Sequence, residues 1–87
     1  MKEIVIDCAK ISSMAQMHEV LARELNFPKW YGKNLDSLHD CLTSVSEETQ
    51  IIFLHFSALT FPSAGLLRVL GDSEHENGKL EISLLTN

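Results

Sequence analysis

One short segment of the chain, Gln50–Phe56, limits the possible folds more than any other. Its sequence Gln-Ile-Ile-Phe-Leu-His-Phe is almost continuously apolar, yet it is far shorter than the about 20 residues that a membrane-spanning helix needs. A strand exposed on one face would carry polar side chains at every second position. The run therefore predicts a central strand of a parallel sheet, covered on both faces.

Two further strands and three helices are predicted around this segment. Runs of strand length lie near both ends of the chain, and apolar residues recur at helical spacing between them. The predicted strands are 3–8, 50–56 and 80–85, and the predicted helices are 14–27, 34–45 and 63–75. This alternation favours an α/β fold in which helices pack on a small three-stranded parallel sheet.

Capping residues mark most of the predicted helix ends. Ser13 followed by Gln16 fits a capping box at the start of the first helix, and Asn34 is a good N-cap for the second. Pro28 is expected to end the first helix, because the residue before a proline avoids the α region. Gly71 is the weakest point of the third helix, at about 1 kcal/mol relative to Ala.

The size and charge of the chain narrow the functional classes. Eighty-seven residues leave room for one domain, so residues 1–87 are expected to form a single unit. Twelve acidic and seven basic residues give a net charge of −5, which argues against direct nucleic-acid binding and favours a basic partner or plain solubility. With no membrane-length apolar run and no signal peptide at Met1–Asp7, the protein is expected to be cytoplasmic and off the membrane. On its own it is expected to be a monomer.

The cysteine and histidine residues outside the second helix are expected to be structural. Cys8 lacks the spacing of a metal or redox motif and is expected, like Cys41, to be a buried thiol. His18 and His55 lie among apolar residues and are predicted to fill core positions. His75 is expected at the end of the third helix, where a positive charge is favourable.

The second predicted helix has one face that burial does not explain. Its apolar stripe, expected to face the sheet, is Leu35, Leu38, Leu42 and Val45. A second stripe with little apolar content is Asp36, His39, Asp40 and Thr43. Asp36 and Asp40 repel each other at i, i+4 by about 0.2–0.5 kcal/mol, and within the segment only Lys29 and Lys33 are available to neutralise them.

Two aromatic residues directly precede this acidic stripe. Trp30 and Tyr31 lie in a short loop with Gly32, where core packing is not obviously demanded. Aromatic side chains next to paired charges on one exposed surface are typical of an interaction hot spot. The simpler interpretation is a solvated acidic helix face with two loop aromatics folded over the core.

The segment Pro28–Thr43 resembles the barstar family of ribonuclease inhibitors. The shared pattern is an aromatic pair followed by Gly-x-Asn-Leu-Asp-small-Leu-x-Asp-Cys-Leu-Thr, and a weaker likeness extends over most of the chain. The resemblance implies a barstar-like fold and a protein that blocks a basic barnase-type ribonuclease by laying this helix and its preceding loop into the active site. The implied role is inhibition or immunity, not enzymatic activity, and it requires no cofactor.

The resemblance also implies roles for individual residues. Asp40 would enter the phosphate pocket of the nuclease, where a carboxylate can substitute for an RNA phosphate. Asp36 would meet a neighbouring basic side chain, and Tyr31 would lie against the catalytic histidine. The full set of expected partner-binding residues is Trp30, Tyr31, Gly32, Asn34, Leu35, Asp36, His39, Asp40, Thr43 and Val45, with Asp72 and Glu74 as candidate contacts from the third helix.

This sequence departs from the family pattern at several contact positions. His39 and Val45 stand where the best-known member has tryptophan, and Trp30 stands where it has tyrosine. These differences bear on which partner is bound. An alternative is a barstar-fold binding module for another basic protein.

Metal binding and catalysis are the weaker alternatives. Asp36, His39 and Asp40 could share an ion, but three ligands from one helix without a partner motif are a non-specific signal, so no metal is expected. Asp40 next to Cys41 resembles a base beside a nucleophile, yet nearby carboxylates oppose formation of the thiolate. No catalytic residue is therefore expected.

Overall fold

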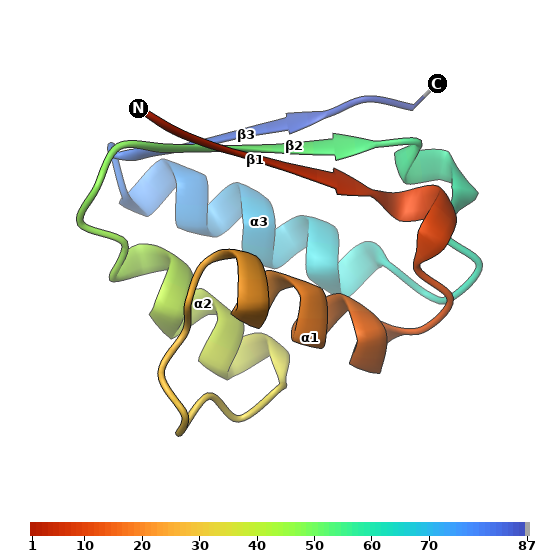
Figure 1. Ribbon diagram of the computed structural model, residues 1–87, viewed down its shortest axis with the longest axis horizontal. Coiled ribbons are helices and arrows are strands. Elements are labelled where there is room, and N and C mark those ends of the chain that lie inside the picture. Colours follow the sequence, from red (N-terminus) through yellow and green to blue (C-terminus); the bar gives the residue numbers. More distant parts are fainter. Residues whose placement is uncertain (87) are drawn as a thin grey trace.

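The computed structural model describes residues 1–86, which fold as an α/β protein with one sheet (Figure 1). The order of the elements is the predicted one: strand, helix, helix, strand, helix, strand. The strands are β1 (Lys2–Asp7), β2 (Thr49–Leu54) and β3 (Leu80–Leu84), and the helices are α1 (Met14–Glu24), α2 (Leu35–Thr43) and α3 (Ala64–Glu76). Two short 3₁₀ segments, η1 (Cys8–Lys10) and η2 (Phe56–Ala58), follow β1 and β2.

The sheet is parallel, and β2 is its middle strand, as the apolar run indicates. Ile4 pairs with Ile51 and Ile51 with Ile82, so all three isoleucines occupy one row across the sheet. Because side chains alternate along a strand, this register places one set of apolar residues from all three strands on a common face.

The three helices lie together on that face, which gives the protein two layers (Figure 1). The expectation that β2 is covered on both faces is therefore wrong. Along β2, Thr49, Ile51 and Phe53 are buried, whereas Ile52 and Leu54 on the other face are half-buried. Three short helices supply only one covering layer, and isoleucine also suits an open strand because of its β-propensity.

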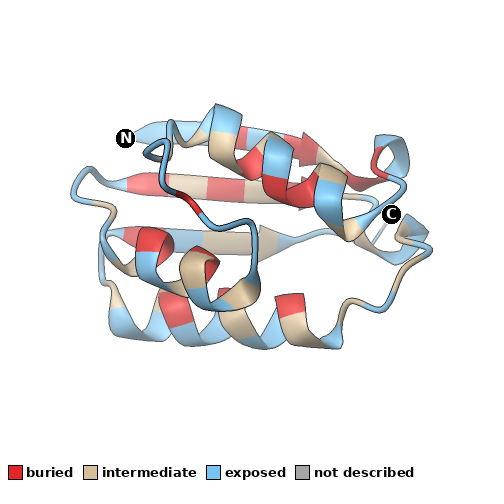
Figure 2. Cartoon of the chain, turned by 90° about the horizontal axis from the view of Figure 1, so that it is seen from below, coloured by how far each residue is buried: buried red, intermediate tan, exposed pale blue. Residues whose placement is uncertain are grey.

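The core lies between the sheet and the helices, and each helix carries buried positions among exposed ones (Figure 2). Phe53 on the middle strand is fully buried, and each helix contributes fully buried side chains to the same core. The largest of these are Met17 and Leu21 from α1, Leu38 and Leu42 from α2, and Leu66 and Leu70 from α3. No helix in residues 1–86 has both the length and the hydropathy to cross a membrane.

Helix α1 begins as predicted and ends earlier than predicted. The Ser13 hydroxyl accepts a hydrogen bond from the backbone N–H of Gln16 at 3.1 Å. The Gln16 side chain accepts one from the backbone N–H of Ser12, whereas in a capping box it would bond to that of Ser13. The helix ends at Asn26 and not at Pro28. Asn26 has a φ of 54°, and the Phe27 N–H donates a hydrogen bond to the Ala22 carbonyl at 2.9 Å. This is a Schellman arrangement, in which asparagine tolerates the left-handed region.

Two histidine predictions have opposite outcomes. His18 is buried, as predicted, with 4% of its surface exposed. The expectation that His55 fills the core is wrong, because His55 is exposed at the end of β2, has φ of 55° and lies 3.1 Å from the Asp7 carboxylate. Because the backbone turns sharply at His55, its imidazole lies outside the core.

Candidate functional site

The loop 25–34 and helix α2 form the part of the molecule that sequence analysis singles out. The loop extends beyond the helices on their side away from the sheet, and α2 follows it directly (Figure 1). The rigid core holds α2, because Leu38 and Leu42 are completely buried.

The start of α2 is fixed by local hydrogen bonds. The Asn34 Oδ1 atom accepts the backbone N–H of Ser37 at 2.8 Å, and its amide donates to the Gly32 carbonyl at 3.3 Å. A Cβ atom on Gly32 would lie 2.6 Å from the Ser37 hydroxyl oxygen, so glycine allows the loop to pass close to the helix. The predicted roles of Asn34 and Gly32 next to a partner therefore coincide with structural roles in orienting the helix.

We call Asp36, His39, Asp40 and Thr43 the acidic face of α2. Asp36 and Asp40 are exposed, and His39 and Thr43 are half-exposed. Within residues 1–86, neither aspartate has a cation within 4 Å, so Lys29 and Lys33, the two lysines available in the segment, do not pair with them. The position of Asp36 in the first turn favours its negative charge, because the helix dipole is positive there. The two carboxylates remain available to an external cation.

The helix is two residues shorter than predicted at its C-terminal end. It ends at Thr43, whose hydroxyl donates to the His39 carbonyl at 2.8 Å, and Val45 lies beyond it as a half-buried residue. The Asn77 side chain donates to the carbonyls of Leu42 and Val45 at 3.0 and 2.9 Å. The Asn77 amide thus takes the place of the backbone N–H groups that a longer helix would offer to these carbonyls, and α2 does not extend to Val45.

The two adjacent aromatic residues have different environments. Trp30 is 71% exposed, whereas Tyr31 is only 8% exposed and packs against Phe27 with ring centroids 4.9 Å apart. The Tyr31 hydroxyl and the His18 Nδ1 atom are 2.5 Å apart and share a hydrogen bond. Tyr31 thus packs into the core, as the simpler interpretation of the loop aromatics expects, whereas Trp30 is exposed. Contact of either side chain with a partner stays a prediction.

Burial keeps both members of this pair uncharged. It raises the pKa of Tyr31 to about 12 and, together with the charge of Lys33, lowers the pKa of His18. A neutral tyrosine and a neutral imidazole can satisfy each other in a buried site at little cost. The pair ties the loop to α1.

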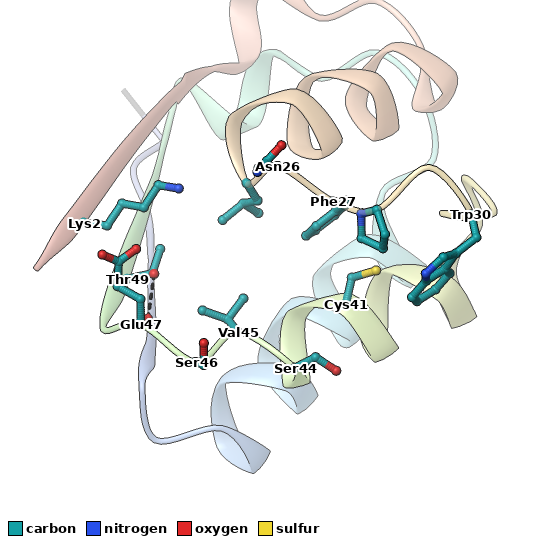
Figure 3. Close-up of a pocket in the computed structure, with 12 residues that line it drawn as sticks. Lys2, Asn26, Phe27, Trp30, Cys41, Ser44, Val45, Ser46, Glu47 and Thr49 are labelled. Carbon is teal, nitrogen blue, oxygen red and sulfur yellow. Dashed lines mark hydrogen bonds between the residues drawn. The ribbon is translucent and has the colours of Figure 1, made fainter.

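A hollow of about 310 Å³ lies between the loop and the segment that follows α2 (Figure 3). Trp30 and Cys41 border it at one end, and Lys2, Glu47 and Thr49 lie at the other. Apolar side chains form most of the wall between them: Leu25, Phe27, Pro28 and Val45.

Leu35, another predicted partner contact, is half-buried at the first position of α2.

The acidic residues of α3 have three different roles. The Glu74 carboxylate accepts the Ile82 backbone N–H at 2.6 Å, so it joins α3 to β3. Asp72 is exposed and adds to the negative potential around His39. Glu76, which sequence analysis does not select, lies 2.5 Å from the His39 Nε2 atom. No local pattern marks Glu76, because the contact arises only when two separate helices pack together.

Other chemistries have little support in this site. Among residues 1–86, no three His, Cys, Asp or Glu side chains are arranged to hold a metal ion, so the ligand set Asp36, His39 and Asp40 is not formed. Cys8 and Cys41 are free and buried, as predicted. Burial and a neighbouring aspartate raise the pKa of both thiols, that of Cys8 to about 11, which opposes formation of a nucleophilic thiolate.

A two-layer α/β fold presents a helix with two exposed carboxylates that have no basic side chain within 4 Å in residues 1–86, next to an exposed tryptophan, and such a surface is typical of protein-recognition domains. Comparison with known proteins identifies its family: residues 1–83 match the family described as Barstar (barnase inhibitor), and the chain belongs to this family. It is 44% identical over 43 residues to "Putative ribonuclease inhibitor YrdF" of Bacillus subtilis (strain 168). That match covers 49% of this chain and 47% of the relative.

Proposed function

We propose that this protein inhibits a basic barnase-type ribonuclease by occluding its active site with α2 and the preceding loop. One observation carries the proposal: Asp36 and Asp40 are exposed on a capped helix, and no basic side chain of residues 1–86 lies within 4 Å of either carboxylate. Two such carboxylates repel each other in the free protein, and a basic cleft would relieve that repulsion.

The chemistry of an RNA-binding cleft fits this surface. A site that holds RNA phosphates presents arginine, lysine and histidine side chains, and carboxylates form charge-assisted hydrogen bonds with the same groups. Asp40 is assigned to the phosphate pocket and Asp36 to a neighbouring basic side chain. Trp30 and Leu35 would cover the edge of the contact and exclude water from these charged pairs.

The net charge of −5 supports a basic partner. Opposite charges on the two proteins would accelerate their encounter. We propose further that the protein acts in the cytoplasm as a monomer that binds one nuclease molecule, as an immunity or self-protection protein.

An inhibition panel tests the proposal. Purified protein is mixed one to one with each of several barnase-type ribonucleases, and cleavage of a fluorogenic RNA is followed. Wild-type protein is expected to abolish cleavage by at least one enzyme, and Asp40→Ala is expected to restore it.

Glu19→Ala is the matched control. It also removes one negative charge from a helix, but Glu19 lines a hollow of α1 next to β1 and lies outside the acidic face. Inhibition by this variant should equal that of wild type. Failure of the wild-type protein to inhibit any enzyme in the panel, together with binding to another basic protein, would favour the alternative role of a general binding module.

A further inference from the structure

His39 connects the acidic face of α2 to α3. Its Nε2 atom lies 2.5 Å from the Glu76 Oε2 atom, and the two side chains are 33% and 52% exposed. Water and a partner protein can therefore reach both groups.

The two helices are held in this relation by other contacts. Asn77 follows α3 directly, and its side-chain amide donates to carbonyls at the end of α2. Buried residues of both helices also share the core, among them Leu42 and Leu70. The packing of α2 against α3 thus places His39 and Glu76 opposite each other.

His39 is surrounded by negative charge. Glu76 and Asp72 face it from α3, and Asp40 faces it from its own helix, with Asp36 one turn before it. The hydrogen bond to Glu76 is the largest effect and raises the pKa of His39 from its ordinary value. Desolvation comes next in size and opposes it, and the charges of Glu76, Asp40 and Asp72 raise the pKa further. Below its pKa, the His39 ring therefore carries a positive charge that interacts with these carboxylates in the free protein.

We propose that His39 makes partner binding proton-linked: a cationic side chain of the bound protein replaces the His39 proton as the counter-ion of Glu76 and Asp40, so binding releases a proton and tightens as the pH rises. This proposal rests on the proposed function, since it concerns how the same surface receives its basic partner.

The direction follows from electrostatics. An arginine or lysine placed against Asp40 or Glu76 repels the imidazolium and removes the hydrogen bond that stabilises it, so the complex holds the His39 proton more weakly. Linkage then requires that the association constant increase with pH, by up to about tenfold per pH unit below the pKa of free His39. Above that pKa, the imidazole is already neutral and the effect disappears.

The first experiment uses the free protein and needs no partner. NMR titration of the His39 ring in wild type and in Glu76→Gln measures the proton affinity directly. We expect wild-type His39 to titrate above about 6.5, the ordinary histidine value, and Glu76→Gln to lower its midpoint. Identical midpoints in the two proteins would overturn the proposal, whatever the function of the protein.

The second experiment measures the Kd of a ribonuclease from the inhibition panel at pH 5.5, 6.5 and 7.5. His39→Gln keeps a hydrogen-bond donor near Glu76 but cannot titrate. We expect the ratio of the wild-type Kd to the His39→Gln Kd to fall by about tenfold or more over this range. Groups of the nuclease that titrate affect both proteins equally and cancel in the ratio.

His55→Asn is the matched control, since His55 is also an exposed histidine paired with a carboxylate, that of Asp7, and lies outside the acidic face. Asparagine tolerates its positive φ. The ratio of the wild-type Kd to the His55→Asn Kd should be constant with pH. Tight binding with a constant ratio for His39→Gln as well would overturn the proton linkage and leave the inhibitor function intact, whereas absence of binding to every nuclease would overturn the function itself.

Discussion

Tyr31 and His18 form a buried hydrogen bond that joins the loop 25–34 to helix α1. The two atoms are 2.5 Å apart, and both residues are less than 10% exposed. The tyrosine next to the acidic face is therefore part of the scaffold, whereas Trp30 is exposed, and contact of either residue with a partner stays a prediction. A family motif specifies residue types at fixed spacing, but the packing around each side chain decides how it is used.

Tyr31→Phe is expected to reduce the free energy of unfolding by about 1–3 kcal/mol, because the buried His18 Nδ1 atom loses its partner. Equilibrium unfolding in urea, followed by circular dichroism, measures the change. Trp30→Phe, at a site that is 71% exposed, should change the unfolding free energy by no more than about 0.5 kcal/mol. Equal effects of the two substitutions would contradict the distinction between scaffold and contact residue.

The protein should lose stability in mild acid through His18. Burial lowers the pKa of folded His18, so below about pH 6.5 the unfolded chain binds a proton that the folded chain resists. The contribution of His18 to the free energy of unfolding should therefore fall as the pH drops from 7 to 5, so the free energy of unfolding of wild type minus that of His18→Gln should decrease over this range. His39, whose pKa is raised, acts in the opposite direction: its stabilising effect is complete below about pH 6.5 and is lost as the pH rises through its folded pKa.

Gly71→Ala should stabilise the protein by up to about 1 kcal/mol. Gly71 lies inside α3 and is exposed, and a Cβ atom placed on it meets nothing within 4 Å. Urea unfolding of the variant provides the measurement. Gly65 is the control, because its Cβ would lie 2.7 Å from the Leu35 side chain, and alanine there should stabilise the protein less or destabilise it.

Much of the fold can be predicted from local sequence signals. The middle position of β2 follows from its apolar run, and the starts of α1 and α2 follow from Ser13 and Asn34, because a capping side chain needs only its own nearby backbone. The end of α1 is predicted too late because Pro28 is a more visible stop signal than Asn26, although the left-handed Asn26 comes first along the chain.

The candidate site is harder to predict, because its decisive contacts join distant segments. The acidic face itself is visible in the helical spacing of Asp36 and Asp40. The His39–Glu76 contact spans 37 residues, and the His18–Tyr31 contact spans 13. Neither has a local pattern, since each depends on how two separate elements pack.

Association with a nuclease should be fast at low salt and slow at high salt. An acidic surface facing a basic cleft can raise the on-rate to about 10⁸–10⁹ M⁻¹s⁻¹, against about 10⁵–10⁶ M⁻¹s⁻¹ without steering. Raising the ionic strength from about 0.01 M to 1 M shortens the Debye length from about 30 Å to 3 Å and removes most of this gain. Stopped-flow mixing across this range measures the on-rate.

Charge reversal at an exposed rim residue such as Glu47 or Glu48 should lower the on-rate modestly. The off-rate should depend much less on salt, because desolvated short-range contacts at Asp40 control it. An on-rate that stays constant from low to high salt would mean that the acidic excess contributes to solubility alone.

Asp40→Ala should weaken binding by about 2–5 kcal/mol, because the basic pocket of the nuclease loses its counter-ion. The Asp40 side chain is exposed, so the free energy of unfolding should stay within about 0.5 kcal/mol of wild type or rise slightly as repulsion with Asp36 disappears. Calorimetric titration and urea unfolding of the same variant separate the two effects. Loss of more than about 1 kcal/mol of stability with unchanged binding would assign Asp40 a structural role.

The most direct test of active-site occlusion is the inhibition of one nuclease at increasing concentrations of a non-cleavable RNA analogue. If α2 occupies the cleft that binds RNA, the analogue must displace the inhibitor, and the apparent inhibition constant should rise in proportion to analogue concentration above its Kd. An inhibition constant that stays the same at saturating analogue would show that the two bind at separate sites, and it would contradict insertion of the acidic face into the RNA-binding cleft.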